Sequence, residues 1–334
     1  MSAGLDQTRL DDWLQSQDLG RSVLIERISG GQSNPTFFVD TDRQRIVLRK
    51  KPDGKILPGA HAIEREYRAM SALFGTGVPV PQPLALCEDE AVLGTAFYVM
   101  QRLEGRVFHD AALPGVSPDD RRAIYLSMAE TLAKLHAVDP AAVGLGDFGR
   151  PAGYFERQHK RWLSQWQQAQ MNDIPEIDQL ADWLASHMPA DDGIASIVHG
   201  DFRIGNLLYA PDEPRVIGIL DWELATLGHP LADLGFCCMT WRTTPDEYGG
   251  INGLGDATPG LPARDEFIAH YMEHANLGLG LKPFHEAFAF FRFAVIFVGI
   301  AERARLGNAA DPEAVNLAPL ARRFAARGLE AIGR

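Results

Sequence analysis

The chain has 334 residues, of which 46% are hydrophobic, and this is enough for a large core divided between two domains or lobes. Its formal net charge of −12 argues against a nucleic-acid partner, because sequence-independent binding needs a basic face. The three cysteines (Cys87, Cys237 and Cys238) are too few for a disulfide framework and lack the C-x-x-C spacing of zinc sites, so we expect a reduced, cytoplasmic protein.

The first hundred residues predict a mixture of strands and helix. The stretch TFFVDTDRQRIVLRK carries apolar runs on both sides of a polar turn at 40–44, which is typical of two short strands. HAIEREYRAMSALFGTG instead places its apolar residues in a helical stripe that Gly75 and Gly77 end. Further extended segments are expected at 24–31, 78–86 and 96–105.

From about residue 117 the pattern becomes mainly helical. Ser117, followed by proline and two aspartates, is typical of a helix start, because Ser caps free N–H groups and acids favour the positive end of the dipole. The apolar stretch 283–306 is interrupted by His285, Glu286 and Arg292. Its charge-free part is about half of the roughly 20 residues that span a bilayer, so we expect a buried helix and no membrane partner. Other helices are predicted over 155–170, 176–188, 264–277 and 312–332.

One β-rich island interrupts these helices. It contains SIVHGDF, NLLY and RVIGILDW, and the last two predict a hairpin. HGDFRIGN has the spacing H-x-D-x-x-x-x-N of a protein-kinase catalytic loop, and another Asp ends the strand in LDWE. Phosphoryl transfer needs a carboxylate beside the attacking hydroxyl and hard oxygen ligands for Mg²⁺, so Asp201, Asn206 and Asp221 are candidates. We expect His199 to hold the loop by hydrogen bonds rather than to act as a general base.

The island and its continuation, VHGDFRIGNLLY and VIGILDWELATLGHPLADLGF, resemble the aminoglycoside phosphotransferase/choline kinase family. The chain is most similar to the branch that includes the kinase-like domains fused to some acyl-CoA dehydrogenases. GGQSNPTFF, LRKKP, HAIERE and GHPLAD add to the resemblance, which covers roughly residues 20–305. It implies an α+β, bilobal protein-kinase-like fold, with a small antiparallel β N-lobe over 1–102 and a helical C-lobe over 103–334. It also implies transfer of the γ-phosphoryl group of Mg-ATP to a hydroxyl of a small molecule.

By the same resemblance, Asp201 is the catalytic base and Asn206 and Asp221 are the Mg²⁺ ligands. The loop SGGQSNPTFF has the place of the phosphate-covering loop but lacks the pattern G-x-G-x-x-G, and an ordinary hairpin turn explains its two glycines equally well. If it does cover the phosphates, Ser33 or Asn34 adds a side-chain donor. The backbone amides that would line the phosphates are those of Gly31, Gln32, Ser33 and Asn34.

The strand IVLR aligns with the V-A-I-K strand of kinases, which places Arg49 at the phosphate-pairing lysine and Val47 over the adenine. Both side chains share one face of a regular strand, although a bulge would bring Lys51 into this role instead. Glu66 fits the partner glutamate on the following helix better than Glu64. The two are about 200° apart around the helix, so only one can serve. The hinge contacts to adenine are expected at the Gln101 carbonyl and the Leu103 amide.

Two departures from protein kinases follow the second aspartate. Trp222 and Glu223 replace the Phe and Gly of D-F-G, and the lost glycine suggests that the enzyme lacks the regulatory flip of this segment. The chain then runs into GHPLADLGF without an A-P-E-like end, so a protein substrate is not expected. Asp233 in this stretch is expected to support the catalytic loop or to cap the helix that follows.

The sequence leaves the acceptor, the choice of ATP or GTP and the oligomeric state open. An unspecified small hydroxylated metabolite ranks first as acceptor, a hydroxy acid or hydroxyacyl-CoA second, and an aminoglycoside third. A nucleotide-binding pseudokinase without transfer activity is the alternative function. A metal-dependent hydrolase that uses His199, the Asp pair and His229 is a third interpretation.

Overall fold

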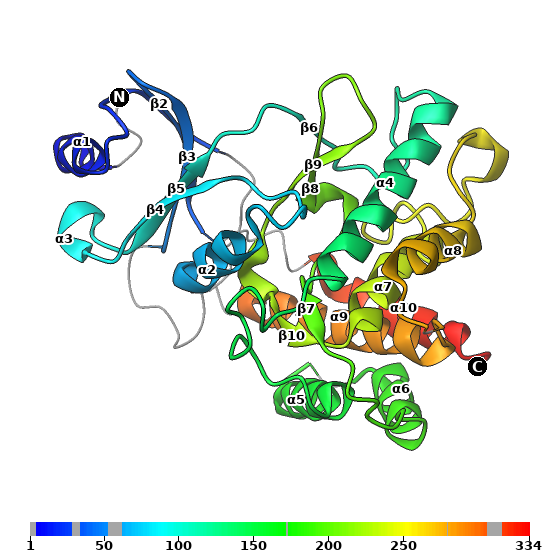
Figure 1. Cartoon of the computed structure of the whole chain (residues 1–334). Coiled ribbons are helices and arrows are strands. Elements are labelled where there is room, and N and C mark those ends of the chain that lie inside the picture. Colours follow the sequence, from blue (N-terminus) through cyan, green and yellow to red (C-terminus); the bar gives the residue numbers. More distant parts are fainter. Residues whose placement is uncertain (1–4, 29–33, 53–61, 172, 279, 306–315) are drawn as a thin grey trace. The chain divides into compact units, whose positions relative to one another are not determined.

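The computed structural model describes residues 5–28, 34–52, 62–171, 173–278, 280–305 and 316–334. The chain divides into two compact units (Figure 1). Unit 1 consists of Met1–Arg106 and Ile217–Ala225, and unit 2 of Val107–Val216 and Thr226–Arg334. The sequence had predicted a first lobe over 1–102 and a second over 103–334. Unit 1 instead extends to Arg106 and also includes Ile217–Ala225, the segment that carries Asp221.

Unit 1 is built on an antiparallel sheet with the strand order β1-β2-β3-β5-β4. Its central strand β3 buries Ile46, Val47 and Leu48 in succession, as expected for a strand that is covered on both faces. The strand pair expected over 36–50 is confirmed. The strands are β1 (Ser22–Arg27), β2 (Thr36–Thr41), β3 (Arg45–Lys50), β4 (Pro83–Cys87) and β5 (Phe97–Gln101).

The helix predicted after β3 is confirmed as α2 (Ile63–Leu73), which buries Ile63, Glu66, Met70 and Leu73 along one stripe. The chain then passes Gly75 and Gly77, whose φ angles of +86° and +92° favour glycine. Unit 1 also contains two helices and one 3₁₀ turn that the sequence did not predict: α1 (Gln7–Ser16), α3 (Glu90–Leu93) and η2 (Trp222–Leu224).

Unit 2 is mainly helical. Ser117 is the N-cap of α4, and its hydroxyl accepts the backbone N–H of Asp120 at 3.2 Å, so the predicted helix start is confirmed. The helix expected over 312–332 begins outside the described residues, and its described part is α10. The helices are α4 (Pro118–His136), α5 (Tyr154–Gln168), α6 (Pro175–Ser186), α7 (Pro230–Cys238), α8 (Arg264–Ala275), α9 (Pro283–Arg305) and α10 (Ala318–Ala331).

The short strands of the island separate into two small sheets. β7 (Ser196–Val198) pairs antiparallel with β10 (Thr226–Gly228), while β6 (Arg106–Val107), β8 (Leu207–Tyr209) and β9 (Val216–Ile219) are hydrogen-bonded in the order β6-β8-β9. The predicted hairpin is therefore confirmed as β8 and β9. The remaining 3₁₀ turns are η1 (Ile204–Asn206), η3 (Met239–Trp241) and η4 (Gly255–Ala257).

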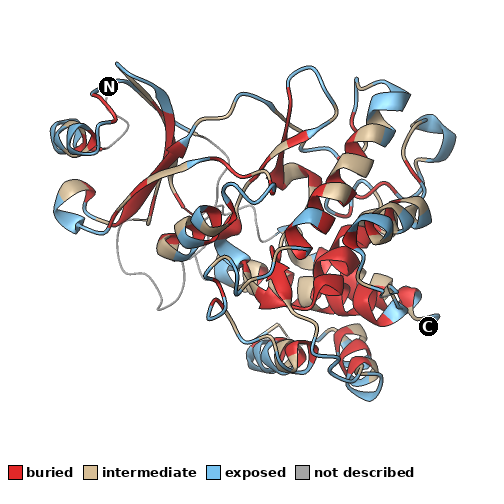
Figure 2. Cartoon of the chain, viewed as in Figure 1, coloured by how far each residue is buried: buried red, intermediate tan, exposed pale blue. Residues whose placement is uncertain are grey.

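Helix α9 is the centre of the core of unit 2 and lies along α10 (Figures 1 and 2). It is long and apolar enough to cross a bilayer by composition, yet 72% of its most apolar 18-residue stretch is buried within the protein. The prediction of a buried helix is confirmed. Glu286 on this helix is fully buried and forms ion pairs with Arg242 and Arg264, which explains how the core contains a carboxylate.

A helix was expected after Asp233, but α7 begins earlier, at Pro230, so Asp233 lies inside it and the alternative role as a cap is wrong. All nine residues of α7 are buried, so it lacks the polar face that makes helical periodicity visible. It packs closely against α9 at Gly235, where an added Cβ would lie 2.6 Å from the carbonyl oxygen of His285.

Candidate functional site

The candidate residues of unit 1 gather around Arg49. Its Nε lies 2.7 Å from Oε2 of Glu66, and its Nη2 donates to Oδ1 of Asp221 at 2.7 Å. Lys51 pairs with Glu64 instead. The structure therefore brings together Arg49, Glu66 and Asp221. The alternatives that the sequence left open, Lys51 and Glu64, form a separate pair.

Glu66 is held from three sides although only 1% of its side chain is exposed. Besides Arg49, the Tyr98 hydroxyl donates to Oε2 at 3.0 Å and the Asn34 amide donates to Oε1 at 2.7 Å. Tyr98 faces Arg49 across the β3–β5 pair, a register that the sequence did not reveal. A buried carboxylate with this many donors has a fixed position, so the Arg49 guanidinium is also fixed.

Burial disfavours the charged form of both members of this pair, but with different net results. It raises the pKa of the Glu66 carboxyl above its ordinary value, and the nearby charge of Arg49 offsets only part of this rise. For Arg49 burial by itself would lower the pKa, but the negative charges of Glu66 and Asp221 and the hydrogen bond with Glu66 outweigh it and raise the pKa. Arg49 therefore stays positively charged, as a group that pairs with phosphate must be.

Asp221 has an unusual backbone. It adopts φ +64° and ψ +65°, the left-handed region that residues other than glycine rarely occupy. The next residue, Trp222, is 2% exposed and its Nε1 donates to the carbonyl of Ile219 at 3.0 Å. The buried indole anchors the turn, and the turn directs the Asp221 carboxylate to Arg49. Such strain is often found at functional sites.

The other residues predicted to bind nucleotide are placed less completely. Gly31, Gln32 and Ser33 lie outside the described residues. Asn34 is described, and its side-chain amide donates a hydrogen bond to Glu66. Only the backbone N–H of Asn34 would then donate to a phosphate, and not the side chain as the sequence had also suggested. Val47 is buried on β3, Gln101 ends β5, and Leu103 follows in the segment after it, half-buried. Their contacts with adenine remain predictions.

The candidate residues of unit 2 lie on the loop between β7 and β8. Asn206 donates its Nδ2 to Oδ2 of Asp201 at 2.7 Å and to the Asp201 carbonyl at 2.9 Å. Arg203 reaches the same Oδ2 from Nε at 3.4 Å. The Asp201 side chain remains 24% exposed, so it is positioned by its neighbours and still open to an acceptor. Asp201 and Asn206 thus come together as the spacing predicted.

Asp233 supports this loop from helix α7. Its Oδ2 accepts the backbone N–H of His199 at 2.6 Å, and its Oδ1 accepts that of Gly200 at 2.9 Å. Gly200 has φ +84°, a conformation that favours glycine and turns both N–H groups to one carboxylate. His199 is fully buried, and its Nδ1 accepts the N–H of Asp201 at 3.2 Å. Both residues therefore have the loop-holding contacts that we expected.

Three residues that the sequence did not indicate complete this support. His136 of α4 contacts Asp233 Oδ2 from Nε2 at 3.4 Å and the hydroxyl of Tyr271 from Nδ1 at 2.7 Å. Arg292 of α9 donates to the Gly200 carbonyl at 2.5 Å. Burial alone would raise the pKa of Asp233, but the hydrogen bond and charge of His136 outweigh it and lower the pKa. No local pattern marks these residues, because they come from three different helices.

A cavity of about 70 Å³ opens beside the loop and is lined in part by Arg203 and Gly205. Its other walls carry His109, Phe236, Phe293 and Phe324. The aromatic ring of Tyr248 also lines it and packs on Phe293 with ring centroids 5.4 Å apart. The wall of this cavity therefore combines several aromatic rings with the side chains of Arg203 and His109.

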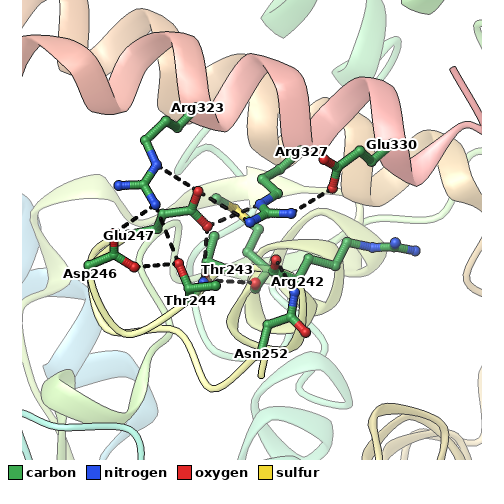
Figure 3. Close-up of polar contacts among 10 residues, drawn as sticks. Arg242, Thr243, Thr244, Asp246, Glu247, Asn252, Arg323, Arg327 and Glu330 are labelled. Carbon is green, nitrogen blue, oxygen red and sulfur yellow. Dashed lines mark hydrogen bonds and ion pairs between the residues drawn. The ribbon is translucent and has the colours of Figure 1, made fainter. Parts of the chain in front are cut away.

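Glu247 lines the same cavity, but two arginines of α10 neutralise it (Figure 3). Arg323 Nε lies 2.8 Å from its Oε1, and Arg327 Nε lies 3.0 Å from its Oε2. The N–H of Thr244 donates to Oε2 at 3.0 Å. Burial would raise the pKa of Glu247, but this N–H and the two guanidinium groups lower it. The cluster fixes the loop that presents Tyr248.

The interpretation as a hydrolase finds no support in the position of His229. Its Nδ1 accepts the N–H of Leu231 at 3.2 Å as the N-cap of α7, and its Nε2 contacts Asp192 at 3.3 Å. His199 is likewise engaged within its own loop. Both histidines therefore have structural partners.

Known proteins share both the sequence and the fold. Residues 24–271 match the family model APH, phosphotransferase enzyme family. The chain is 42% identical over 314 residues to acyl-CoA dehydrogenase family member 11 of Gallus gallus, a match that covers 92% of this chain and 40% of that protein. The chain thus spans about two fifths of the length of this curated relative.

Two solved structures show the fold. A protein of Ralstonia eutropha JMP134, provisionally assigned as an aminoglycoside phosphotransferase, is 43% identical, with a TM-score of 0.89 and 98% of both chains covered. Spectinomycin phosphotransferase APH(9)-Ia, solved with ADP and spectinomycin, is 11% identical, with a TM-score of 0.66 and 98% of both chains covered. The expected α+β, protein-kinase-like fold is confirmed, and the chain belongs to the APH phosphotransferase enzyme family.

Proposed function

We propose that this chain is an ATP-dependent phosphotransferase that moves the γ-phosphoryl group of Mg-ATP to a hydroxyl of a small molecule. The observation that carries the proposal is the Asp201 carboxylate, which Asn206 holds at 2.7 Å and which remains 24% exposed, on a loop whose Arg203 and Gly205 line a cavity. A positioned carboxylate within hydrogen-bond reach of a hydroxyl can accept its proton as the oxygen attacks phosphorus.

The side-chain chemistry of the candidate residues, taken one by one, fits the nucleotide and its metal. Asn206 offers a carbonyl oxygen and Asp221 a carboxylate, the hard oxygen donors that Mg²⁺ prefers. These two residues would hold Mg²⁺, which neutralises charge on the phosphates when it is bound. Arg49, charged and fixed by Glu66, would pair with a phosphate oxygen, and the Asp221 carboxylate that it now contacts would then be shared with the metal.

The walls of the cavity favour a particular class of acceptor. Arg203 and His109 can bind an anionic group, while Phe236, Phe293 and Phe324 suit a hydrocarbon segment. Glu247, the carboxylate on this wall, is already paired with two arginines, so a polycation gains little from it. This chemistry supports a hydroxy acid or hydroxyacyl compound over an aminoglycoside.

A nucleotide-binding pseudokinase is the second candidate, and one contact favours it. The Nη2 of Arg49 lies 2.7 Å from Oδ1 of Asp221, so a cation of the protein already engages the carboxylate that should bind metal. In a pseudokinase this contact would persist in the presence of nucleotide, and ATP would bind without Mg²⁺.

The deciding experiment measures ADP formation from Mg-ATP with a library of hydroxy acids, hydroxyacyl thioesters and amino sugars, together with ATP affinity by calorimetry. We expect wild-type turnover with an anionic hydroxyl compound and a loss of about 10²–10⁴-fold in kcat for Asp201→Asn with ATP affinity retained. Asp256→Asn, an exposed aspartate of η4 outside both candidate clusters, is the matched control and should keep full activity. If ATP binds but no acceptor increases ADP formation, the pseudokinase is the supported function. If ATP does not bind, both functions are rejected.

A further inference from the structure

Two histidines and a glutamate meet where helix α8 packs on α4, and no step of the proposed transfer uses them. His270 Nε2 lies 3.1 Å from Oε1 of Glu130, and His274 Nε2 lies 3.9 Å from the same oxygen. The potential ligand atoms of the three side chains all lie within 4.8 Å of one another. We propose that Glu130, His270 and His274 form a binding site for Zn²⁺ or a similar divalent transition-metal ion.

The positions on the helices suit this role. His270 and His274 are four residues apart on α8, so both rings lie on one helical face, and their centroids are 4.4 Å apart. Glu130 comes from α4 and supplies a carboxylate oxygen from the opposite side. In a tetrahedral zinc site with bonds of about 2.0–2.2 Å, neighbouring ligand atoms are about 3.4 Å apart. The present atoms, all within 4.8 Å of one another, would approach this spacing when the ion binds.

The hydrogen bond of His274 leaves one ring nitrogen for a metal. Its Nδ1 contacts the backbone carbonyl of His270 at 2.7 Å, and because a carbonyl only accepts, Nδ1 carries the proton. Nε2, which lies 3.9 Å from Oε1 of Glu130, is then the ring atom that can bind a metal. Metal-binding histidines commonly donate their other ring N–H to a carbonyl in this way.

The ligand set indicates which metal and what purpose. Two imidazoles and one carboxylate suit Zn²⁺ and other borderline ions, whereas Mg²⁺ prefers oxygen ligands alone. The side chains are 22% to 38% exposed, so an ion can enter from solvent and water can complete the coordination. Bound metal would link α4 to α8 on the surface of unit 2.

The link lies next to the support of the catalytic loop. Tyr271, between the two histidines in sequence, contacts His136 of α4 through its hydroxyl at 2.7 Å. His136 in turn contacts Asp233, which accepts the N–H groups of His199 and Gly200. A metal that holds α8 on α4 therefore stabilises the outer end of this chain of hydrogen bonds. Its function is structural, and the proposal does not depend on the transfer reaction.

Cobalt and zinc titrations of the intact chain, with saturating Mg²⁺ present to occupy oxygen-rich sites, test the site. We expect one Co²⁺ per chain with the visible absorption of a low-symmetry nitrogen-containing site, displacement by Zn²⁺, and a higher Tm with Zn²⁺. Glu130→Gln and His274→Ala should each weaken binding by at least about tenfold, the lower end of the loss seen even for outer-shell partners. They should also abolish the Zn²⁺-dependent rise in Tm.

His187→Ala is the matched control. His187 also bonds through Nδ1 to a backbone carbonyl four residues earlier, that of Trp183 at 2.9 Å, but it belongs to no three-residue donor group within the described part of the chain. This variant should bind Co²⁺ like the wild type. Circular dichroism establishes that each variant is folded before titration. Equal cobalt affinity in wild type, Glu130→Gln and His274→Ala would overturn the proposal, as would a wild type that binds no cobalt.

Discussion

Arg49 of β3 and Glu66 of α2 form a buried ion pair in which Nε lies 2.7 Å from Oε2. The same guanidinium donates to Asp221, so one side chain connects the sheet, the helix and the candidate metal ligand of unit 1. Buried pairs of this kind contribute little net stability when complete, but the loss of one partner leaves an uncompensated charge. The pair is therefore a position at which stability and nucleotide binding depend on the same atoms.

Arg49→Ala should destabilise the protein far more than Lys51→Ala. The first change leaves the buried Glu66 carboxylate without its cation, and we expect the free energy of unfolding to fall by about 3 kcal/mol. The second breaks a pair whose side chains are 27% and 33% exposed, and it should cost less than about 1 kcal/mol. Urea unfolding of both variants measures this difference, and equal losses would contradict the assignment of Arg49 as the buried partner.

Glu247→Gln should change how stability depends on pH. Interactions with Thr244, Arg323 and Arg327 lower the folded-state pKa of Glu247 below the unfolded value of about 4.3. Its contribution is therefore fully present above the unfolded pKa and is lost as pH falls through the folded pKa. At pH 7 the variant should be less stable by about 2 kcal/mol.

Because glutamine does not titrate, the difference in unfolding free energy between wild type and Glu247→Gln should shrink below about pH 4. Urea unfolding of both proteins at pH 7, 5 and 3.5 measures this difference in unfolding free energy. A difference that stays constant over this range would show that the carboxylate charge contributes nothing to the clamp on α10.

Tyr248→Ala should weaken binding of the acceptor without affecting the nucleotide. The Tyr248 ring lines the cavity beside the catalytic loop and packs on Phe293 and Phe297, with centroids 5.4 and 5.1 Å apart. Loss of the ring removes apolar contact area, so we expect the acceptor KM to rise about tenfold while the ATP KM stays constant. Tyr248→Phe keeps the ring and serves as the matched control. An unchanged acceptor KM in Tyr248→Ala would place the acceptor elsewhere.

Gly235→Ala should lower the free energy of unfolding and Gly299→Ala should raise it, although both changes place alanine in a helix. At Gly235 the new Cβ would lie 2.6 Å from the His285 carbonyl oxygen, so α7 and α9 must separate, at a cost of roughly 1–3 kcal/mol. At Gly299 the nearest atom is Nη1 of the flexible Arg303 side chain at 3.4 Å. There alanine should gain roughly 0.5–1 kcal/mol through its helix propensity. Thermal unfolding measures whether Tm falls for Gly235→Ala and rises for Gly299→Ala. A higher Tm for Gly235→Ala would disprove the close contact between α7 and α9.

Much of the local structure could be predicted because its causes are local. Ser117 caps α4 by accepting the N–H of Asp120, three residues away. The β2–β3 hairpin follows from two apolar runs joined by a polar turn. Asp201 and Asn206 are five residues apart on one loop, so their spacing alone could suggest that they meet. The start of helix α7 was not predicted correctly, because burial on all sides removes the contrast between apolar and polar faces that marks the bounds of a helix.

The sequence by itself determined the family, the candidate base Asp201 and the residues proposed to bind nucleotide and metal, because these depend on short motifs. Only the tertiary structure decided that Arg49 pairs with Glu66 while Lys51 pairs with Glu64. It also revealed that Asp233 holds the catalytic loop and that Arg323 and Arg327 neutralise Glu247. Such partners are distant in sequence, and strand register and helix packing, which no local pattern encodes, bring them into contact.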